Sequence, residues 1–134
     1  MEYIRNLIRN VPDFPKKGIA FKDITPVLAD IEALRLAVKE MASPFEDSGI
    51  DVVVGIESRG FIFGTPIADI LNANFVPVRK PGKLPWKTEK IEYELEYGTD
   101  SLEIHLDGIK KGQRVLIVDD LLATGGTAEA TCKL

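Results

Sequence analysis

Three short runs of the chain are apolar on both faces. They are "IDVVVGI" at residues 50–56, "ANFVPV" at residues 73–78 and "VLIV" at residues 115–118, the last preceded by Arg114. Continuous apolar runs of this length, separated by helical stretches, are typical of the strands of a buried parallel sheet. The pattern predicts an α/β fold with a Rossmann-like open parallel sheet and helices on both of its faces.

Helical and alternating patterns surround these runs. Apolar residues recur at helical spacing over residues 3–11, and again over residues 30–41, where Asp30 is a plausible N-cap. Residues 12–26 hold three prolines, which predicts an extended, turn-rich segment outside the sheet core. Between residues 91 and 106, apolar and polar residues alternate on both sides of "GTD" at residues 98–100, which predicts a β-hairpin with its turn at those three residues.

Polar and glycine-rich sequences follow each of the three predicted strands. "ESRG" follows the first, "RKPGK" follows the second, and "DDLLATGGT" follows the third. Open α/β sheets bind their ligands at the carboxyl ends of the strands, so we expect these three segments to meet in one site.

The segment after the third strand has two chemically different halves. Gly125 and Gly126 allow the backbone to turn its N–H groups inward, and the hydroxyls of neighbouring threonines and a helix N-terminus add donors, which favours a phosphate monoester. Asp119 and Asp120 would repel that phosphate, but ionised carboxylates accept hydrogen bonds from vicinal hydroxyls. The two halves together indicate ribose 5-phosphate. An ordinary turn and a solvated acidic pair remain the alternatives, and no Walker loop occurs.

Composition narrows the class of partner. The chain has 134 residues and a net charge of −4, which gives no general electrostatic footprint for nucleic acid or an anionic membrane. We therefore expect small-molecule substrates, with no nucleic acid and no membrane. One cysteine excludes an internal disulfide framework, and no signal peptide or long apolar span is evident, so a cytoplasmic location is expected.

The whole stretch "VLIVDDLLATGGT" resembles the phosphoribosyl-pyrophosphate-binding motif of the type I phosphoribosyltransferase family. "DFPKKGIAFKDITP", "GIESRGFIFG", "RKPGKLPWKT" and "YELEYGTDSLEIH" resemble, in that order, the members of this family that use adenine. The resemblance implies an enzyme of purine salvage, a pentosyl transferase that converts adenine and phosphoribosyl pyrophosphate into AMP and pyrophosphate with Mg²⁺. The ion would be held mainly by the substrate's pyrophosphate and ribose, with no dedicated metal ligands in the protein. A homodimer is also implied.

The resemblance assigns roles residue by residue. Glu96 would handle the purine proton and Arg59 would bind pyrophosphate, the two catalytic assignments, and a non-proline cis peptide is implied between Ser58 and Arg59. Adenine would contact Ala20, Lys22 and Leu121. The residues expected to bind phosphoribosyl pyrophosphate or AMP are Ser58, Arg59, Lys80, Lys83, Tyr97, Asp119, Asp120, Ala123, Thr124, Gly125, Gly126 and Thr127.

A single phosphoribosyltransferase domain is expected over residues 1–134. It would contain a hood segment at residues 1–30, a flexible loop and hairpin at 80–106, and the phosphoribosyl-pyrophosphate loop at 115–127. The resemblance also implies that C-terminal strands of the family fold are missing. Two other functions stay open at this point: a related purine or xanthine phosphoribosyltransferase, and a noncatalytic nucleotide-binding regulatory module.

Overall fold

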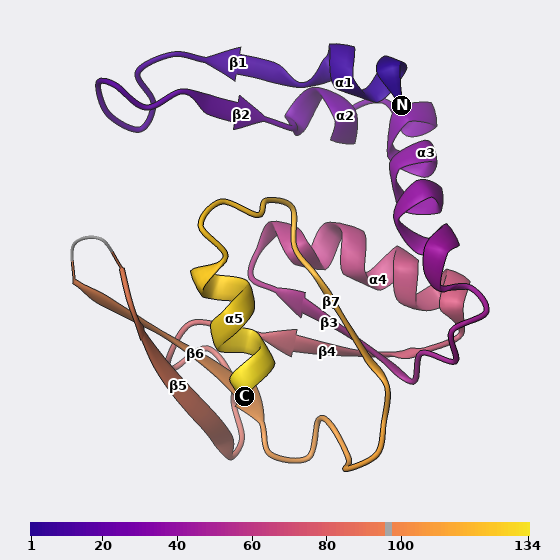
Figure 1. Cartoon of the computed structure of the whole chain (residues 1–134), viewed down its shortest axis with the longest axis vertical. Helices are drawn as coiled ribbons and strands as arrows, with labels where there is room; N and C mark the ends of the chain where they lie inside the picture. The colour runs from indigo at the N-terminus through magenta and orange to yellow at the C-terminus, as the bar shows by residue number, and fades with distance from the viewer. Residues whose placement is uncertain (96–97) are drawn as a thin grey trace. The chain divides into compact units, whose positions relative to one another are not determined.

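The computed structural model describes residues 1–95 and 98–134. It divides the chain into two compact units, Met1–Ser43 and Pro44–Leu134, which are described separately below (Figure 1). The longest helix of the described residues has 13 residues, and none is long and apolar enough to cross a lipid bilayer.

The first unit combines a small hairpin with three helices. Its elements are α1 (Glu2–Leu7), β1 (Arg9–Val11), β2 (Phe21–Asp23), α2 (Thr25–Leu28) and α3 (Ile31–Ala42). The N-cap prediction is confirmed, because the Asp30 carboxylate accepts hydrogen bonds from the backbone N–H groups of Glu32 and Ala33 at 3.0 and 3.1 Å.

The helix predicted over residues 3–11 is wrong in its second half. It ends at Leu7, and residues 9–11 form β1, which pairs antiparallel with β2. The helix does not continue to Val11 because Val11 precedes Pro12, and a residue before proline favours extended backbone over helix.

The second unit carries the sheet. After a 3₁₀ turn at Ser43–Phe45, the chain forms β3 (Val52–Ile56), α4 (Arg59–Leu71), β4 (Asn74–Val78), β5 (Thr88–Glu94), β6 (Thr99–His105), β7 (Val115–Val118) and α5 (Gly126–Lys133). The strand order is β4-β3-β7 with both pairs parallel, and β5 pairs antiparallel with β6. The predicted parallel sheet and inserted hairpin are confirmed.

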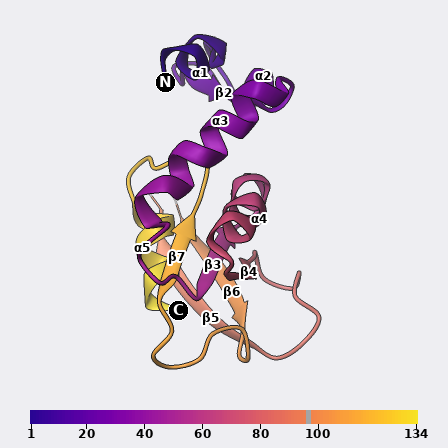
Figure 2. The same ribbon diagram turned by 90° about the vertical axis from the view of Figure 1, so that its right-hand side faces the viewer.

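The two faces of the sheet are covered differently (Figure 2). Helix α4 packs on one face, where Gly55 and Gly64 leave space for the ring of Phe75. The other face packs against the hairpin and α5. Its core comprises Val52, Val54, Val76, Val78, Leu102, Ile104 and Ala130. Burial of these apolar side chains stabilises the sheet and so holds the carboxyl ends of its strands in place.

Two of the three residues of "GTD" belong to strand β6 and not to the hairpin turn. Strand β5 ends at Glu94, the N–H of Leu95 donates to the carbonyl of Gly98 at 2.9 Å, and β6 begins at Thr99. Thr99 and Asp100 are therefore strand residues, and Asp100 lies directly opposite Tyr93. The ladder can extend to Thr99 because threonine favours strand conformation, whereas glycine supplies the positive φ of +96° that the turn uses at residue 98.

Candidate functional site

A cavity of about 700 Å³ lies at the carboxyl ends of β3 and β7, beside the hairpin. All three segments that follow the predicted strands contribute to its lining, as expected for an open α/β sheet. The predicted site residues that line it are Ser58, Arg59, Lys80, Asp119, Asp120, Leu121, Ala123, Thr124, Gly125, Gly126 and Thr127.

The end of β3 is joined to the end of β4 by Glu57. Its Oε2 atom accepts a hydrogen bond from the backbone N–H of Lys80 at 2.6 Å and lies 3.3 Å from Nε of Arg79. The non-proline cis peptide lies between Glu57 and Ser58, one link earlier than the Ser58–Arg59 position expected from the resemblance. Ser58 is the N-cap residue of α4.

Arg59 is held by one of the two adjacent aspartates. Its Nε lies 2.6 Å from Oδ2 of Asp120, whose side chain is only 11% exposed. This approach depends on Gly60, because a Cβ there would lie 2.8 Å from the carbonyl oxygen of Val118. The close contact between α4 and the end of β7 thus places a guanidinium at the carboxylate pair.

Asp119 has a different environment from Asp120. Its Oδ1 atom accepts a hydrogen bond from the backbone N–H of Asp120 at 2.8 Å. Burial is the main cause that raises the pKa of Asp119 to about 6, and the Asp120 carboxylate adds to the rise, whereas the Asp120 N–H and the charge of Arg59 oppose it. The charge on Asp119 is therefore sensitive to pH near neutrality.

The loop before α5 has the geometry of an anion-binding helix N-terminus. Gly125 is the N-cap residue with φ of +87°, and the first helical hydrogen bond runs from the N–H of Glu129 to the carbonyl of Gly125 at 2.8 Å. The N–H groups of the preceding turn lie at the open end of the helix, where its dipole favours negative charge. Residues 123–127 line the cavity at this end.

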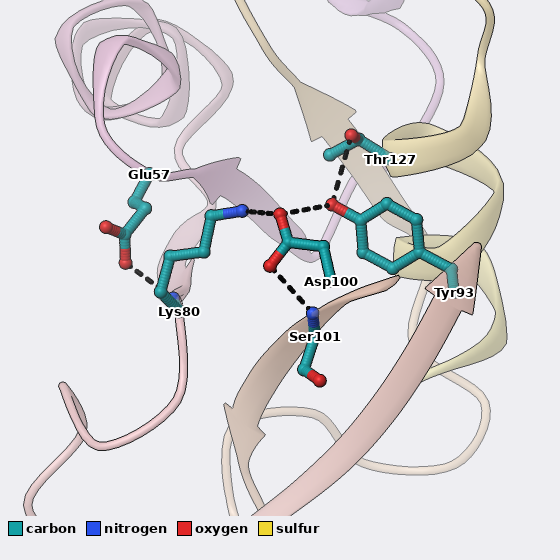
Figure 3. Close-up of polar contacts among 6 residues, drawn as sticks. All are labelled: Glu57, Lys80, Tyr93, Asp100, Ser101 and Thr127. Carbon is teal, nitrogen blue, oxygen red and sulfur yellow. Dashed lines mark hydrogen bonds and ion pairs between the residues drawn. The ribbon is translucent and has the colours of Figure 1, made fainter. Parts of the chain in front are cut away.

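A polar network that sequence reasoning missed lies beside this loop (Figure 3). The Lys80 ammonium forms an ion pair with Oδ2 of Asp100, and the Tyr93 hydroxyl lies 3.3 Å from the same oxygen and 3.4 Å from Oγ1 of Thr127. The backbone N–H of Ser101 donates to the other Asp100 oxygen at 2.8 Å. The sequence pattern places Asp100 in the hairpin turn, so its contact with Lys80 could not be predicted. For Tyr93, the only signal in the sequence was its position in the alternating pattern of the strand.

Five further residues are predicted from the sequence to belong to the site. Lys83 is exposed and does not line it. Glu96 and Tyr97 lie outside the described residues. Ala20 and Lys22 belong to the first unit, where both are exposed and the Lys22 ammonium donates to the side-chain oxygen of Asn10.

A parallel sheet that ends in a carboxylate pair and an anion-binding loop defines a class of α/β protein that binds sugar phosphates. Residues 27–134 match the family model described as the phosphoribosyl transferase domain. The chain is 65% identical over 131 residues to the adenine phosphoribosyltransferase of Rhodopirellula baltica, covering 98% of this chain and 64% of that protein.

Solved structures of adenine phosphoribosyltransferases are also similar to this chain. The crystal structure of adenine phosphoribosyltransferase from Thermoanaerobacter pseudethanolicus matches with a TM-score of 0.95 and 59% identity over 99% of this chain and 77% of that one. The Saccharomyces cerevisiae enzyme, complexed with an imino-altritol bisphosphate and adenine, matches with a TM-score of 0.93 and 40% identity over 99% of this chain and 78% of that one. The chain belongs to the adenine phosphoribosyltransferase family.

Proposed function

We propose that this chain transfers the 5-phosphoribosyl group from phosphoribosyl pyrophosphate to adenine, giving AMP and pyrophosphate in purine salvage. The observation that carries the proposal is the meeting, in one cavity, of an anion-binding loop, two carboxylates and two cationic side chains. These are the groups that a 5-phosphate, a ribose and a pyrophosphate require, and the Saccharomyces cerevisiae relative is described with adenine and a bisphosphate sugar analogue bound.

The 5-phosphate is assigned to the loop at residues 123–127. Its helix N-terminus and threonine hydroxyls point donors at one anion, and the hydrogen bonds contribute more than the roughly 0.3–1 kcal/mol of an exposed helix dipole. The ribose hydroxyls are assigned to Asp119 and Asp120, which are acceptors when ionised. The base is assigned to Leu121, which is 55% exposed in the cavity wall, with Ala20 and Lys22 as further adenine contacts.

Pyrophosphate is assigned to the cationic side of the cavity. Arg59 and Lys80 line it, with Ser58 beside them, and Lys83 is assigned to the same anion from the loop that follows β4. An arginine can donate two parallel hydrogen bonds to a phosphate, whereas lysine acts as a point charge. Both would stabilise negative charge that grows as pyrophosphate leaves.

Magnesium is part of the proposal. Within residues 1–95 and 98–134, no group of three or more His, Cys, Asp or Glu side chains is arranged to hold a metal ion, whereas three carboxylates, of Glu57, Asp119 and Asp120, line the cavity. This donor set fits an ion held mainly by pyrophosphate and ribose oxygens, with Asp119 and Asp120 as anionic groups of the same cavity. When bound, Mg²⁺ would supply positive charge to the leaving group.

In the proposed reaction, a ring nitrogen of adenine bonds to the anomeric carbon while the bond to the pyrophosphate oxygen breaks. The transition state has oxocarbenium character, so the chain's residues act by positioning and by placing charge. Glu96 is assigned the proton released by the purine, and Tyr97 is assigned to substrate binding.

The function is tested by measuring AMP formation from adenine, Mg²⁺ and phosphoribosyl pyrophosphate, with Glu96→Gln beside Glu94→Gln. Glu96→Gln keeps the shape but removes the carboxylate, so we expect kcat to fall by roughly 10²–10⁴-fold with little change in phosphoribosyl pyrophosphate binding. Glu94 is an exposed residue of β5, so its variant is the matched control and should keep full activity. Equal, small effects of both substitutions would remove Glu96 from the mechanism, and absence of AMP formation by the unaltered chain would contradict the function.

The proposal includes a homodimer, on the strength of the family resemblance, and keeps the cytoplasmic location that the sequence predicts. Sedimentation of the purified chain at micromolar concentration should give twice the monomer mass of 14.8 kDa. A monomer over the full concentration range would contradict the dimer.

A further inference from the structure

Lys80 and Asp100 form an ion pair in which only the lysine lines the cavity. The ammonium pairs with Oδ2 of Asp100, which lies outside the lining residues. Asp100 therefore contacts the ammonium from outside the cavity wall. An ammonium has three N–H donors, and a single carboxylate oxygen engages one of them.

Asp100 is itself fixed by neighbours on the hairpin. Its Oδ1 atom accepts a hydrogen bond from the backbone N–H of Ser101 at 2.8 Å, and its Oδ2 atom lies 3.3 Å from the Tyr93 hydroxyl. Tyr93 and Asp100 are direct partners in the β5–β6 ladder, so the hairpin register sets their contact. The Tyr93 hydroxyl also lies 3.4 Å from Oγ1 of Thr127, in the first turn of α5 (Figure 3).

The charges of the pair are stable at neutral pH. Burial is the largest single influence and opposes the charge on Lys80, but the hydrogen bond to Asp100 and the charges of neighbouring acidic groups together outweigh it and raise the pKa of the lysine. Burial is likewise the largest influence on Asp100 and opposes its charge, but the hydrogen bond and charge of Lys80, with the hydrogen bonds from Ser101 and Tyr93, together lower the pKa of the carboxyl. A lysine side chain loses rotamer entropy on being fixed, and a partner that fixes it beforehand reduces the loss on ligand binding.

We propose that Asp100 is a positioning residue that holds the Lys80 ammonium at the pyrophosphate end of the cavity, and that the Tyr93 hydroxyl keeps Asp100 in place. This inference rests on the proposed function, because that function assigns pyrophosphate to Lys80. Asp100 touches no substrate in this arrangement. Its effect is confined to ligands that carry the pyrophosphate group.

The test is calorimetric titration of pyrophosphate with Mg²⁺, and separately of AMP, into the full chain and its variants. Asp100→Asn keeps the shape and removes the charge, so pyrophosphate should bind about tenfold more weakly, while AMP, which lacks the pyrophosphate group, should keep its affinity within about twofold. Tyr93→Phe, which removes only the hydroxyl, should weaken pyrophosphate by a smaller factor and serves if Asp100→Asn fails to fold. Asp107→Asn, an exposed aspartate just after β6, is the matched control and should change neither ligand.

Lys80→Met separates this inference from the function on which it rests. If Lys80→Met weakens pyrophosphate but Asp100→Asn and Tyr93→Phe bind it as the unaltered chain does, the positioning role is wrong and the function stands. If Lys80→Met itself leaves pyrophosphate binding unchanged, the assignment of Lys80 to pyrophosphate is wrong and the positioning role falls with it. Equal weakening of pyrophosphate and AMP by Asp100→Asn would show a general structural effect and overturn the proposal.

Discussion

Asp119 and Asp120 are neighbours in sequence with different electrostatic surroundings. Asp120 is paired with Arg59 at 2.6 Å, whereas the pKa of Asp119 is raised to about 6, chiefly by burial. A pair of identical residues thus contains one carboxylate that pairs with a guanidinium and one that gains a proton under mildly acidic conditions. The sequence could identify the two aspartates but not the difference in their surroundings, because that difference depends on how closely α4 and Arg59 approach the end of β7.

Ribose recognition should therefore depend on pH through Asp119. Above pH 6 its carboxylate is ionised and accepts charge-assisted hydrogen bonds from hydroxyls, and below pH 6 these bonds weaken. The affinity of ribose 5-phosphate relative to methyl phosphate, a monoester without hydroxyls, should fall as the pH is lowered from 7.5 to 5, measured by calorimetry. The ratio cancels the similar ionisation of the two phosphates.

Asp119→Asn is the control for that titration. It should weaken ribose 5-phosphate by roughly 10–150-fold at pH 7.5 and make the affinity ratio independent of pH. A ratio that stays flat in the unaltered chain, or one that still falls in the variant, would assign the pH dependence to another group.

Two adjacent glycines of the loop have separable roles. Gly125 has φ of +87°, a conformation that is unfavourable for a β-branched residue, so Gly125→Val should abolish detectable AMP and phosphoribosyl pyrophosphate binding. Gly126 has no such requirement, and a Cβ there would lie 3.8 Å from Oγ1 of Thr124, an ordinary contact. Gly126→Ala should bind AMP within about twofold of the unaltered chain by calorimetry. Equal losses at both positions would mean that the ligand itself excludes a Cβ.

At the scale of elements, the parallel strands could be predicted because their continuous apolar runs match burial on both faces. The hairpin could be predicted because its alternating pattern matches burial on one face. The first helix could not be bounded correctly, since its pattern of Ile4, Leu7, Ile8 and Val11 continues into residues that pair as β1. The spacing of apolar residues cannot show that residues 9–11 pair with a second strand at residues 21–23. The hairpin register also escaped prediction, and with it the contact between Tyr93 and Asp100, because one turn position fixes every cross-strand pair.

The contact between α4 and β7 gives a test at this scale. In Gly60→Ala, the new Cβ meets the backbone carbonyl of Val118 at 2.8 Å, which cannot move cheaply, so the start of α4 must shift and take Arg59 with it. We expect a stability loss of about 1–3 kcal/mol by urea unfolding and clearly weaker pyrophosphate binding.

Gly64→Ala is the comparison for that variant. Its Cβ meets the Phe75 ring at 2.8 Å, in the middle of the same helix and away from Arg59. It should lose stability but keep pyrophosphate affinity. If Gly60→Ala also keeps the affinity, the close approach at Gly60 does not position Arg59.

At the scale of the whole molecule, the cavity gathers segments that are far apart in the chain. They are the ends of β3 and β7, Lys80 after β4, Tyr93 and Leu102 of the hairpin, and the first turn of α5. Their meeting could be predicted from the rule that parallel strands end at one edge of the sheet. What the rule could not supply is the network of Lys80, Asp100 and Tyr93, because that depends on how the inserted hairpin packs against the sheet.

The most direct test of the proposed function is a comparison of purine bases as substrates for this chain. With Mg²⁺ and phosphoribosyl pyrophosphate, each of adenine, hypoxanthine, guanine and xanthine is supplied alone, and nucleotide and pyrophosphate formation are followed together. An adenine site must complement an exocyclic amine and an unprotonated ring nitrogen, so hydrogen-bonding groups should reject the other three bases by several orders of magnitude. The proposed function predicts AMP and pyrophosphate in equal amounts from adenine and no detectable nucleotide from the other bases. Comparable turnover of hypoxanthine would contradict it.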